Sequence, residues 1–160
     1  MENVIDILFD FSKKSFCEII KEVTEEDIQE CEPENFVKDR MLSIIIGIAG
    51  ETTGRMLLST TVEDGTKIAE YMNFGEPLEN KEDLFLYLAE FANMFCGRTA
   101  TYINNKFGKR EVWITPPSVF SAYEMDIITP NITSKKAYFC TSFGKFLVDV
   151  GYSDNNYDEF

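Results

Sequence analysis

The stretch Asp83–Phe107, DLFLYLAEFANMFCGRTATYINNKF, decides the fold of this chain. It contains no proline and a single glycine, Gly97, and apolar residues fill most of it. Their spacing predicts a long helix with most of its circumference buried. A mostly antiparallel sheet with this helix on one face would supply that burial.

One stripe of the predicted helix is polar or small. Its residues follow one another at steps of three or four and so share one face: Asp83, Tyr87, Glu90, Asn93, Gly97, Thr101 and Asn104. On this face the carboxylate of Glu90 stands one turn before the carboxamide of Asn93. Gly97 follows one turn later, although glycine inside a helix costs roughly 1 kcal/mol relative to alanine.

Two interpretations of the stripe are open. It is either an ordinary solvated face, on which Gly97 lets a neighbouring element pack closely, or a face that presents Glu90 and Asn93 to another molecule. The helical pattern alone does not distinguish these interpretations.

Length and composition indicate a single globular domain. The chain has 160 residues, of which 44% are hydrophobic and 14% aromatic, so it is long enough to bury a core. We expect one domain over residues 1–151, followed by an acidic tail over 152–160. The net charge of −13 disfavours nucleic acid and anionic membrane surfaces as partners, because phosphate binding needs clustered lysine and arginine.

The chain contains no histidine, which excludes several kinds of site. A Ser-His-Asp or Cys-His catalytic site and a histidine-rich zinc site are impossible, and we expect no metal site in this chain. The four cysteines are scattered without a C-x-x-C pair, which favours reduced, mostly packed thiols. With no secretory signal and no apolar run of about 20 residues, the expected location is the cytoplasm.

Periodicity and turn residues predict the order of the remaining elements. Helices are expected over 3–23, 62–72 and 83–107, and strands over 41–49, 55–60, 111–115, 118–128, 135–142 and 145–151. Thr61 or Asp64 should cap the second helix, the last two strands should form a hairpin, and the acidic segment 24–35 should be a solvated connector. The predicted fold class is α+β, with long helices packed on one face of a mostly antiparallel sheet. The other face or an edge would then need cover, which self-association could supply.

Two motifs in this order resemble the CheX/CheC/FliY family of chemotaxis phosphatases. The segment Glu90-Phe-Ala-Asn93-Met-Phe-Cys-Gly97 resembles the helix signature of that family, Glu-x-x-Asn followed by an apolar pair and a glycine. The segment Val112-Trp-Ile-Thr-Pro-Pro117 resembles the strand that follows this helix in CheX-type members. The single Glu-x-x-Asn copy in this setting matches the CheX type, so the resemblance implies a CheC-like fold.

The resemblance also implies a function. It implies a protein phosphatase that hydrolyses the phosphoaspartate of a phosphorylated CheY-type response regulator. Asn93 would position the attacking water, and Glu90 would pair with the active-site lysine of the regulator. Gly97 would give the partner clearance, and the expected remaining partner contacts are Tyr87, Thr101 and Arg98. The regulator would supply Mg²⁺, so no cofactor is expected in this chain, and CheX-type proteins form homodimers through edge strands, here within 118–151.

Two other classes of function stay open. A non-catalytic module of the same fold would bind a phosphorylated regulator or a flagellar switch component without hydrolysing anything. A small-molecule sensor would use the many aromatic residues to line a pocket, although phenylalanine and tyrosine at these spacings are far more often core residues.

Overall fold

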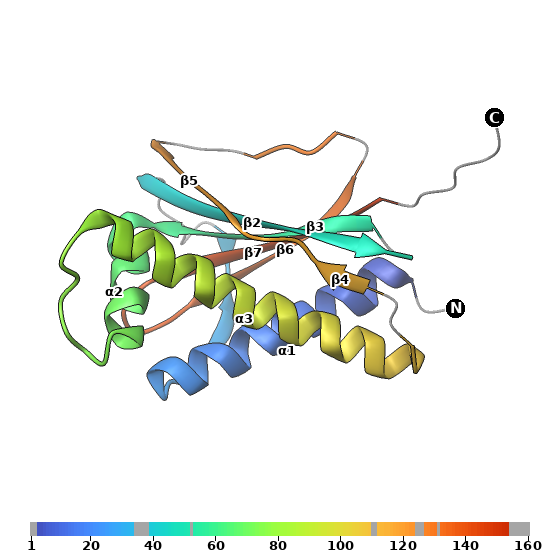
Figure 1. Cartoon of the computed structure of the whole chain (residues 1–160), viewed down its shortest axis with the longest axis horizontal. Coiled ribbons are helices and arrows are strands. Elements are labelled where there is room, and N and C mark those ends of the chain that lie inside the picture. The colour runs from blue at the N-terminus through green and yellow to red at the C-terminus, as the bar shows by residue number, and fades with distance from the viewer. Residues whose placement is uncertain are drawn as a thin grey trace.

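The computed structural model describes residues 3–33, 39–51, 53–109, 112–123, 127–130 and 132–153. Within these ranges three helices lie together on one face of a single sheet (Figure 1). The elements are α1 (Val4–Thr24), β1 (Gln29–Cys31), β2 (Arg40–Gly50), β3 (Thr53–Thr61), α2 (Val62–Met72), α3 (Lys81–Phe107), β4 (Val112–Ile114), β5 (Ser118–Tyr123), β6 (Thr133–Cys140) and β7 (Lys145–Ser153). The predicted α+β class, with helices on one face, is confirmed.

Every strand pairing in the described sheet is antiparallel. The order is β1-β6-β7-β3-β2-β4. β4 pairs with the C-terminal end of β2, and β5 pairs with the N-terminal part of the same strand. β6 and β7 form the predicted hairpin. One edge of the sheet is therefore β1, and the other is shared by β4 and β5.

The long helix α3 has strong signals at both ends. The side chain of Asn80 caps its N-terminus by accepting a hydrogen bond from the backbone N–H of Asp83 at 2.9 Å. Glu82 and Asp83 place negative charge in the first turn, which complements the helix dipole. Gly108 ends the helix in the left-handed conformation, with φ of 66°. The helix thus begins two residues earlier than predicted and ends where predicted.

Phenylalanine side chains join the helical layer to the sheet. Phe16 of α1 is fully buried, and its ring meets Phe91 and Phe95 of α3 edge-on, with centroids 6.0 and 5.7 Å away. On the sheet side the same ring contacts Phe139 and Phe146, at 4.9 and 5.9 Å. Such contacts stabilise beyond the area they bury. These five aromatic side chains form core, as expected.

β4 and β5 both pair with β2, and the segment Thr115-Pro116-Pro117 separates them. Two hydrogen bonds between Thr115 and Gly47 of β2 hold the chain to the sheet at this segment. The Gly47 N–H donates to the Thr115 Oγ1 at 2.8 Å, and the Thr115 N–H donates to the Gly47 carbonyl at 2.9 Å. A Cβ at Gly47 would lie 2.8 Å from that Oγ1, so the approach requires glycine. The arrangement places β4 beside the C-terminal half of α3 (Figure 1).

The prediction that residues 24–35 form a solvated connector is wrong in part. It contains β1, which pairs with β6, and a disulfide joins Cys31 to Cys140 with their Cα atoms 5.8 Å apart. The prediction of reduced thiols is therefore wrong for this pair, while Cys17 and Cys96 are free thiols. Burial raises the pKa of the Cys96 thiol well above its usual value, which keeps it protonated and unreactive. Residues 34 and 35 of the connector lie outside the described part.

Several strand boundaries differ from the prediction. The described part of β5 is Ser118–Tyr123, residues 127 and 128 of the predicted strand are not in a strand, and residues 124–126 lie outside the described part. β6 runs from Thr133 to Cys140. β7 continues to Ser153, two residues past the predicted end of the domain, and the rest of the predicted acidic tail, 154–160, lies outside the described residues. Thr61 caps α2 by accepting from the Asp64 N–H at 3.0 Å, so Asp64 is not the cap.

The sheet face opposite the helices is partly covered by the chain itself. Residues 127–130 pass over it (Figure 1), and the Arg55 Nε donates to the Thr129 Oγ1 there. Arg55 is nearly buried and faces the equally buried Asp149, with their closest N and O atoms 3.3 Å apart. Self-association is therefore not needed to cover this part of the face.

We predict that Phe16→Ala lowers the free energy of unfolding by about 3–5 kcal/mol, because it leaves a cavity where α1, α3 and the sheet meet. Urea unfolding followed by circular dichroism measures this change. Phe107→Ala, at an exposed position near the end of α3, is the control and should change stability by less than about 1 kcal/mol. Equal losses for the two variants would contradict the central role of Phe16.

Candidate functional site

The core contacts of α3 fix which side of this helix faces outward. Leu88, Phe91 and Phe95 are completely buried, and Ala92 and Cys96 are nearly so. Side chains three and four residues apart share a face, so this packing turns the predicted stripe toward solvent. The bulky residues around the Glu-x-x-Asn motif are thus the ones that anchor the helix.

Glu90 and Asn93 lie on the outward side, as the second interpretation of the stripe requires. Glu90 is exposed and Asn93 is half-buried. Within the described ranges, neither side chain makes a hydrogen bond or an ion pair with another part of the chain. The carboxylate and the amide are therefore available to a molecule that approaches α3.

The residues at both ends of the stripe, in contrast, make hydrogen bonds that hold neighbouring elements in place. The Tyr87 hydroxyl donates to the Asn73 Oδ1 at 2.8 Å, which fastens the α2–α3 connection to α3. Asn104 exchanges two hydrogen bonds with the backbone of Val112, at 2.9 and 3.0 Å, and so holds β4. The Thr101 hydroxyl donates to the Gly97 carbonyl at 3.0 Å and remains exposed. The segment from Glu90 to Thr101 is the part of the stripe that the fold leaves accessible.

Gly97 is not required by the packing of the chain. A Cβ built on it would have Ile114 of β4 as its one near neighbour in the described part, at 3.8 Å, which is ordinary van der Waals contact. The interpretation that this glycine admits a closely packed neighbouring element therefore loses its support. What the glycine leaves is an unobstructed surface one turn after Asn93.

Arg98 lies on a different side of α3 from the other predicted site residues. Five residues after Asn93, it sits about 140° around the helix and turns to α1. Its guanidinium binds Glu22 with two hydrogen bonds, at 2.6 and 3.0 Å, and reaches Glu18 at 3.3 Å. The hydrogen bond from Arg98 lowers the pKa of the Glu22 carboxyl. A contact between Arg98 and a partner stays a prediction, whereas its pairing with α1 is structural.

An open hollow adjoins Glu90 on the N-terminal side. Its lining comes from the end of α2 and the start of α3: Met72, Asp83, Leu86, Tyr87 and Glu90. Leu86 is 69% exposed, although the apolar pattern of the helix predicted it to be buried. The sequence prediction missed this hollow because its lining comes from two helices.

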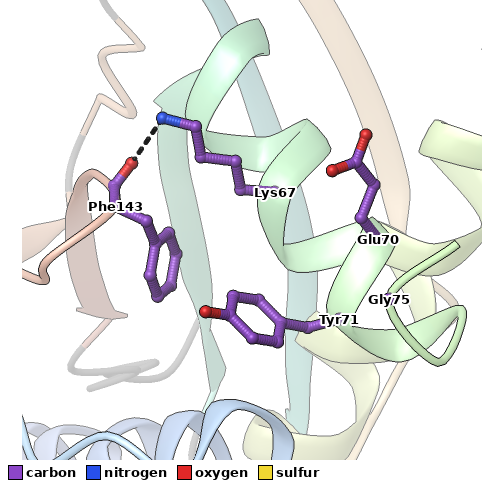
Figure 2. A pocket seen from close by; sticks show the side chains of 5 residues that line it. All are labelled: Lys67, Glu70, Tyr71, Gly75 and Phe143. Atoms are coloured by element: carbon purple, nitrogen blue, oxygen red, sulfur yellow. Dashed lines mark hydrogen bonds between the residues drawn. The ribbon is translucent and has the colours of Figure 1, made fainter. Parts of the chain in front are cut away.

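A second hollow involves α2 but not the stripe. Figure 2 shows Lys67 and Tyr71 of α2 facing Phe143 in the β6–β7 turn, with the Lys67 Nζ donating to the Phe143 carbonyl at 3.0 Å. The rings of Tyr71 and Phe143 are 5.3 Å apart. The hollow is open and its lysine is already engaged, so it gives the small-molecule sensor hypothesis no support.

The described residues form neither a metal-binding cluster nor a membrane-spanning helix. No three or more cysteine or acidic side chains there are grouped so that they could hold a metal ion. None of the helices there is long and apolar enough to cross a membrane.

The comparisons with known proteins concern the family and the fold of the chain. Residues 42–143 match the family model described as chemotaxis phosphatase CheX, and this match covers more than half of the chain. The chain belongs to the CheX family. No curated protein sequence matches it.

Solved structures with the same fold cover nearly the whole chain. CheX from Vibrio vulnificus is 17% identical, covers 95% of this chain over 100% of its own length, and superposes with a TM-score of 0.80. A CheC-like superfamily protein from a Shewanella species is 20% identical, with 95% and 99% coverage and a TM-score of 0.77. The CheX–CheY–BeF3–Mg²⁺ complex from Borrelia burgdorferi matches at 17% identity, 95% and 99% coverage and a TM-score of 0.68. The CheC-like fold is confirmed.

We predict that Gly97→Ala raises the free energy of unfolding by up to about 1 kcal/mol, because the methyl group meets no clash and alanine favours the helix. Thermal and urea unfolding measure the change. Ala92→Gly, at a buried position on the opposite face of α3, is the control and should destabilise the protein. A destabilised Gly97→Ala protein would restore the close-packing explanation of this glycine.

Proposed function

We propose that this CheX-family chain is a phosphatase for the phosphoaspartate of a CheY-type response regulator. In this proposal α3 docks against the active site of the regulator. Asn93 positions the attacking water, and Glu90 pairs with the active-site lysine of the regulator. The observation that carries the proposal is an exposed carboxylate and an amide one turn apart, both without partners in the described part of their own fold.

The reaction asks little of this chain beyond positioning. Water attacks phosphorus in line, the bond from phosphorus to the aspartate oxygen breaks, and aspartate and inorganic phosphate are released. The Mg²⁺ held by the regulator neutralises charge on the phosphoryl oxygens when it is bound. The remaining need is a group that orients the water, and holding a reactant in line is worth several kcal/mol of the barrier.

An asparagine amide suits this task. Its oxygen accepts a hydrogen bond from the water, and its nitrogen donates to an oxygen near the reaction centre. The amide is neutral, so it adds no negative charge beside a phosphoryl group. The amide is therefore a group that a histidine-free chain with a net charge of −13 can bring beside a phosphoryl group without repelling it.

Glu90 has a different task. A carboxylate one turn before the amide can form a charge-assisted hydrogen bond with a lysine of the partner, and this bond sets the register in which Asn93 enters. The accessible Gly97 surface gives the partner backbone room on the other side of Asn93. The family match and the related complex with CheY support a partner of the CheY type.

A homodimer through an edge strand stays a prediction. β5 is the candidate edge, since most of its residues are exposed and its Phe120 is 48% accessible. The proposed site on α3 does not depend on this association, because Glu90 and Asn93 come from one chain.

We predict that Asn93→Ala abolishes the acceleration of dephosphorylation, with at least about a 100-fold loss of the stimulated rate, while binding to the regulator changes little. Phosphate release from a phosphorylated regulator, timed with each protein, measures the rate. Asn105→Ala removes an exposed amide on the same helix but off the stripe, and should behave like the wild type. Equal rates with wild-type and Asn93→Ala protein would defeat the catalytic role, and retained binding would then favour the non-catalytic module.

We predict that Glu90→Ala and Glu90→Gln both weaken binding of the regulator by about 10- to 100-fold, the range expected for a charge-assisted hydrogen bond of about 1.5–3 kcal/mol. Isothermal titration calorimetry measures the affinity. Glu63→Ala, which removes a carboxylate that is 81% exposed on α2, is the control for a general charge effect. Unchanged affinity in both Glu90 variants would contradict the pairing with lysine.

A further inference from the structure

Phe74 has a left-handed backbone conformation and an exposed side chain, and both are unfavourable for a phenylalanine. It follows the end of α2, where the Gly75 N–H donates to the Glu70 carbonyl at 2.8 Å and the Phe74 N–H donates to the Tyr71 carbonyl at 3.2 Å. These two bonds form a Schellman motif, whose left-handed residue is usually glycine. Here that residue is Phe74, with φ of 59°. A bulky side chain in this region carries a backbone cost of order 1 kcal/mol or more.

The phenyl ring of Phe74 has no evident use inside the molecule. It is 97% exposed, so it contributes no burial to the fold. Glycine at this position would remove both the backbone strain and the exposed apolar surface. A strained and exposed aromatic residue on an otherwise well-formed helix end points to a contact with another molecule.

The connection that carries Phe74 is held firmly. The Asn73 Nδ2 donates to the carbonyls of Glu76 and Pro77, at 3.1 and 3.4 Å, and Tyr87 binds the Oδ1 of the same side chain. Tyr87 belongs to the stripe of α3, so the position of the loop is tied to the helix that presents Glu90 and Asn93. The backbone that carries the ring is therefore held in place, so the loop does not need to be ordered on binding.

The open hollow beside Glu90 extends the accessible stripe toward this loop. Met72 and Leu86 give it apolar walls, and Asp83 and Glu90 add two carboxylates. The α2–α3 connection and the first turn of α3 add three exposed acidic residues, Glu76, Glu79 and Glu82. The one base between residues 73 and 90 is Lys81, which lies over the ring of Phe85 at 5.5 Å. This part of the chain thus combines exposed apolar side chains with an excess of acidic ones.

We propose that Phe74, Leu86 and the hollow form a second contact, an apolar anchor, for the same response regulator that docks on Asn93. The anchor would take a protruding apolar side chain of the receiver domain that is flanked by lysine or arginine. Aromatic and aliphatic groups supply the affinity, while the acidic side chains select the basic surroundings. This inference rests on the proposed function, because the occupant is the partner of the α3 site, and the anchor adds to it the surface that chooses among regulators.

The decisive variant is Phe74→Gly, because it removes the ring and relieves the backbone at the same time. We expect its unfolding temperature to equal or exceed that of the wild type, while its affinity for the regulator falls by about tenfold or more. Leu86→Ser should also weaken binding. Ile128→Ser removes an apolar side chain that is 85% exposed on the far side of the sheet, and should bind like the wild type.

The probe is a CheY-type receiver domain loaded with beryllofluoride and Mg²⁺, chosen by its binding to the wild-type protein and not by phosphate release. Isothermal titration calorimetry gives the affinity.

Binding by Phe74→Gly within twofold of the wild type would overturn the anchor and leave the role of Asn93 intact. Weakened binding by Phe74→Gly, together with normal phosphate release by Asn93→Ala, would overturn the proposed catalysis and keep the anchor. Sedimentation showing that Phe74→Gly breaks up a wild-type dimer would assign the surface to self-association and also overturn the inference.

Discussion

The packing of Phe91 and Phe95 around Phe16 is the constraint from which the rest of the arrangement follows. Each residue of a helix turns the side-chain direction by about 100°, so two buried rings four residues apart leave α3 a single rotation about its axis. In that rotation Glu90, Asn93 and Gly97 face outward. A slip of one residue would turn the amide away from solvent. The chemistry available on the surface is thus set by apolar side chains in the core.

Local pattern was sufficient for most of the fold and for the outward position of Glu90 and Asn93 on α3, but not for contacts between distant segments. The three helices and the β6–β7 hairpin follow from periodicity and turn residues, and the outward stripe follows from helical spacing. β1 carries no such signal, because Gln29–Cys31 becomes a strand through pairing with β6, and its disulfide joins residues 109 positions apart. Arg98 likewise finds its partners on α1, 76 and 80 residues away.

The α2–α3 connection shows a second limit of sequence patterns. Gly75 marks a turn in the sequence, but the Schellman bonds place Phe74 one residue earlier in the left-handed position that glycine usually takes. Leu86 fits the apolar pattern of α3, yet it is exposed because the described neighbouring elements leave a hollow beside it. A hydrophobic pattern reports which residues could be buried, whereas the actual burial depends on where the neighbouring helix ends.

In the proposed reaction the partner supplies the metal and the acyl phosphate, so this chain needs only the two polar side chains on α3. A helix rises about 1.5 Å per residue, so Glu90 and Asn93 are held about 4.5 Å apart along a rigid axis, more firmly than two loop residues would be. The ion pair that Glu90 would form gives the amide its register, and the metal and the acyl phosphate belong to the regulator. A chain with no histidine can then act as a phosphatase, because the one function it must add is placement. Placement depends on stiffness, which the buried phenylalanines at the back of α3 provide.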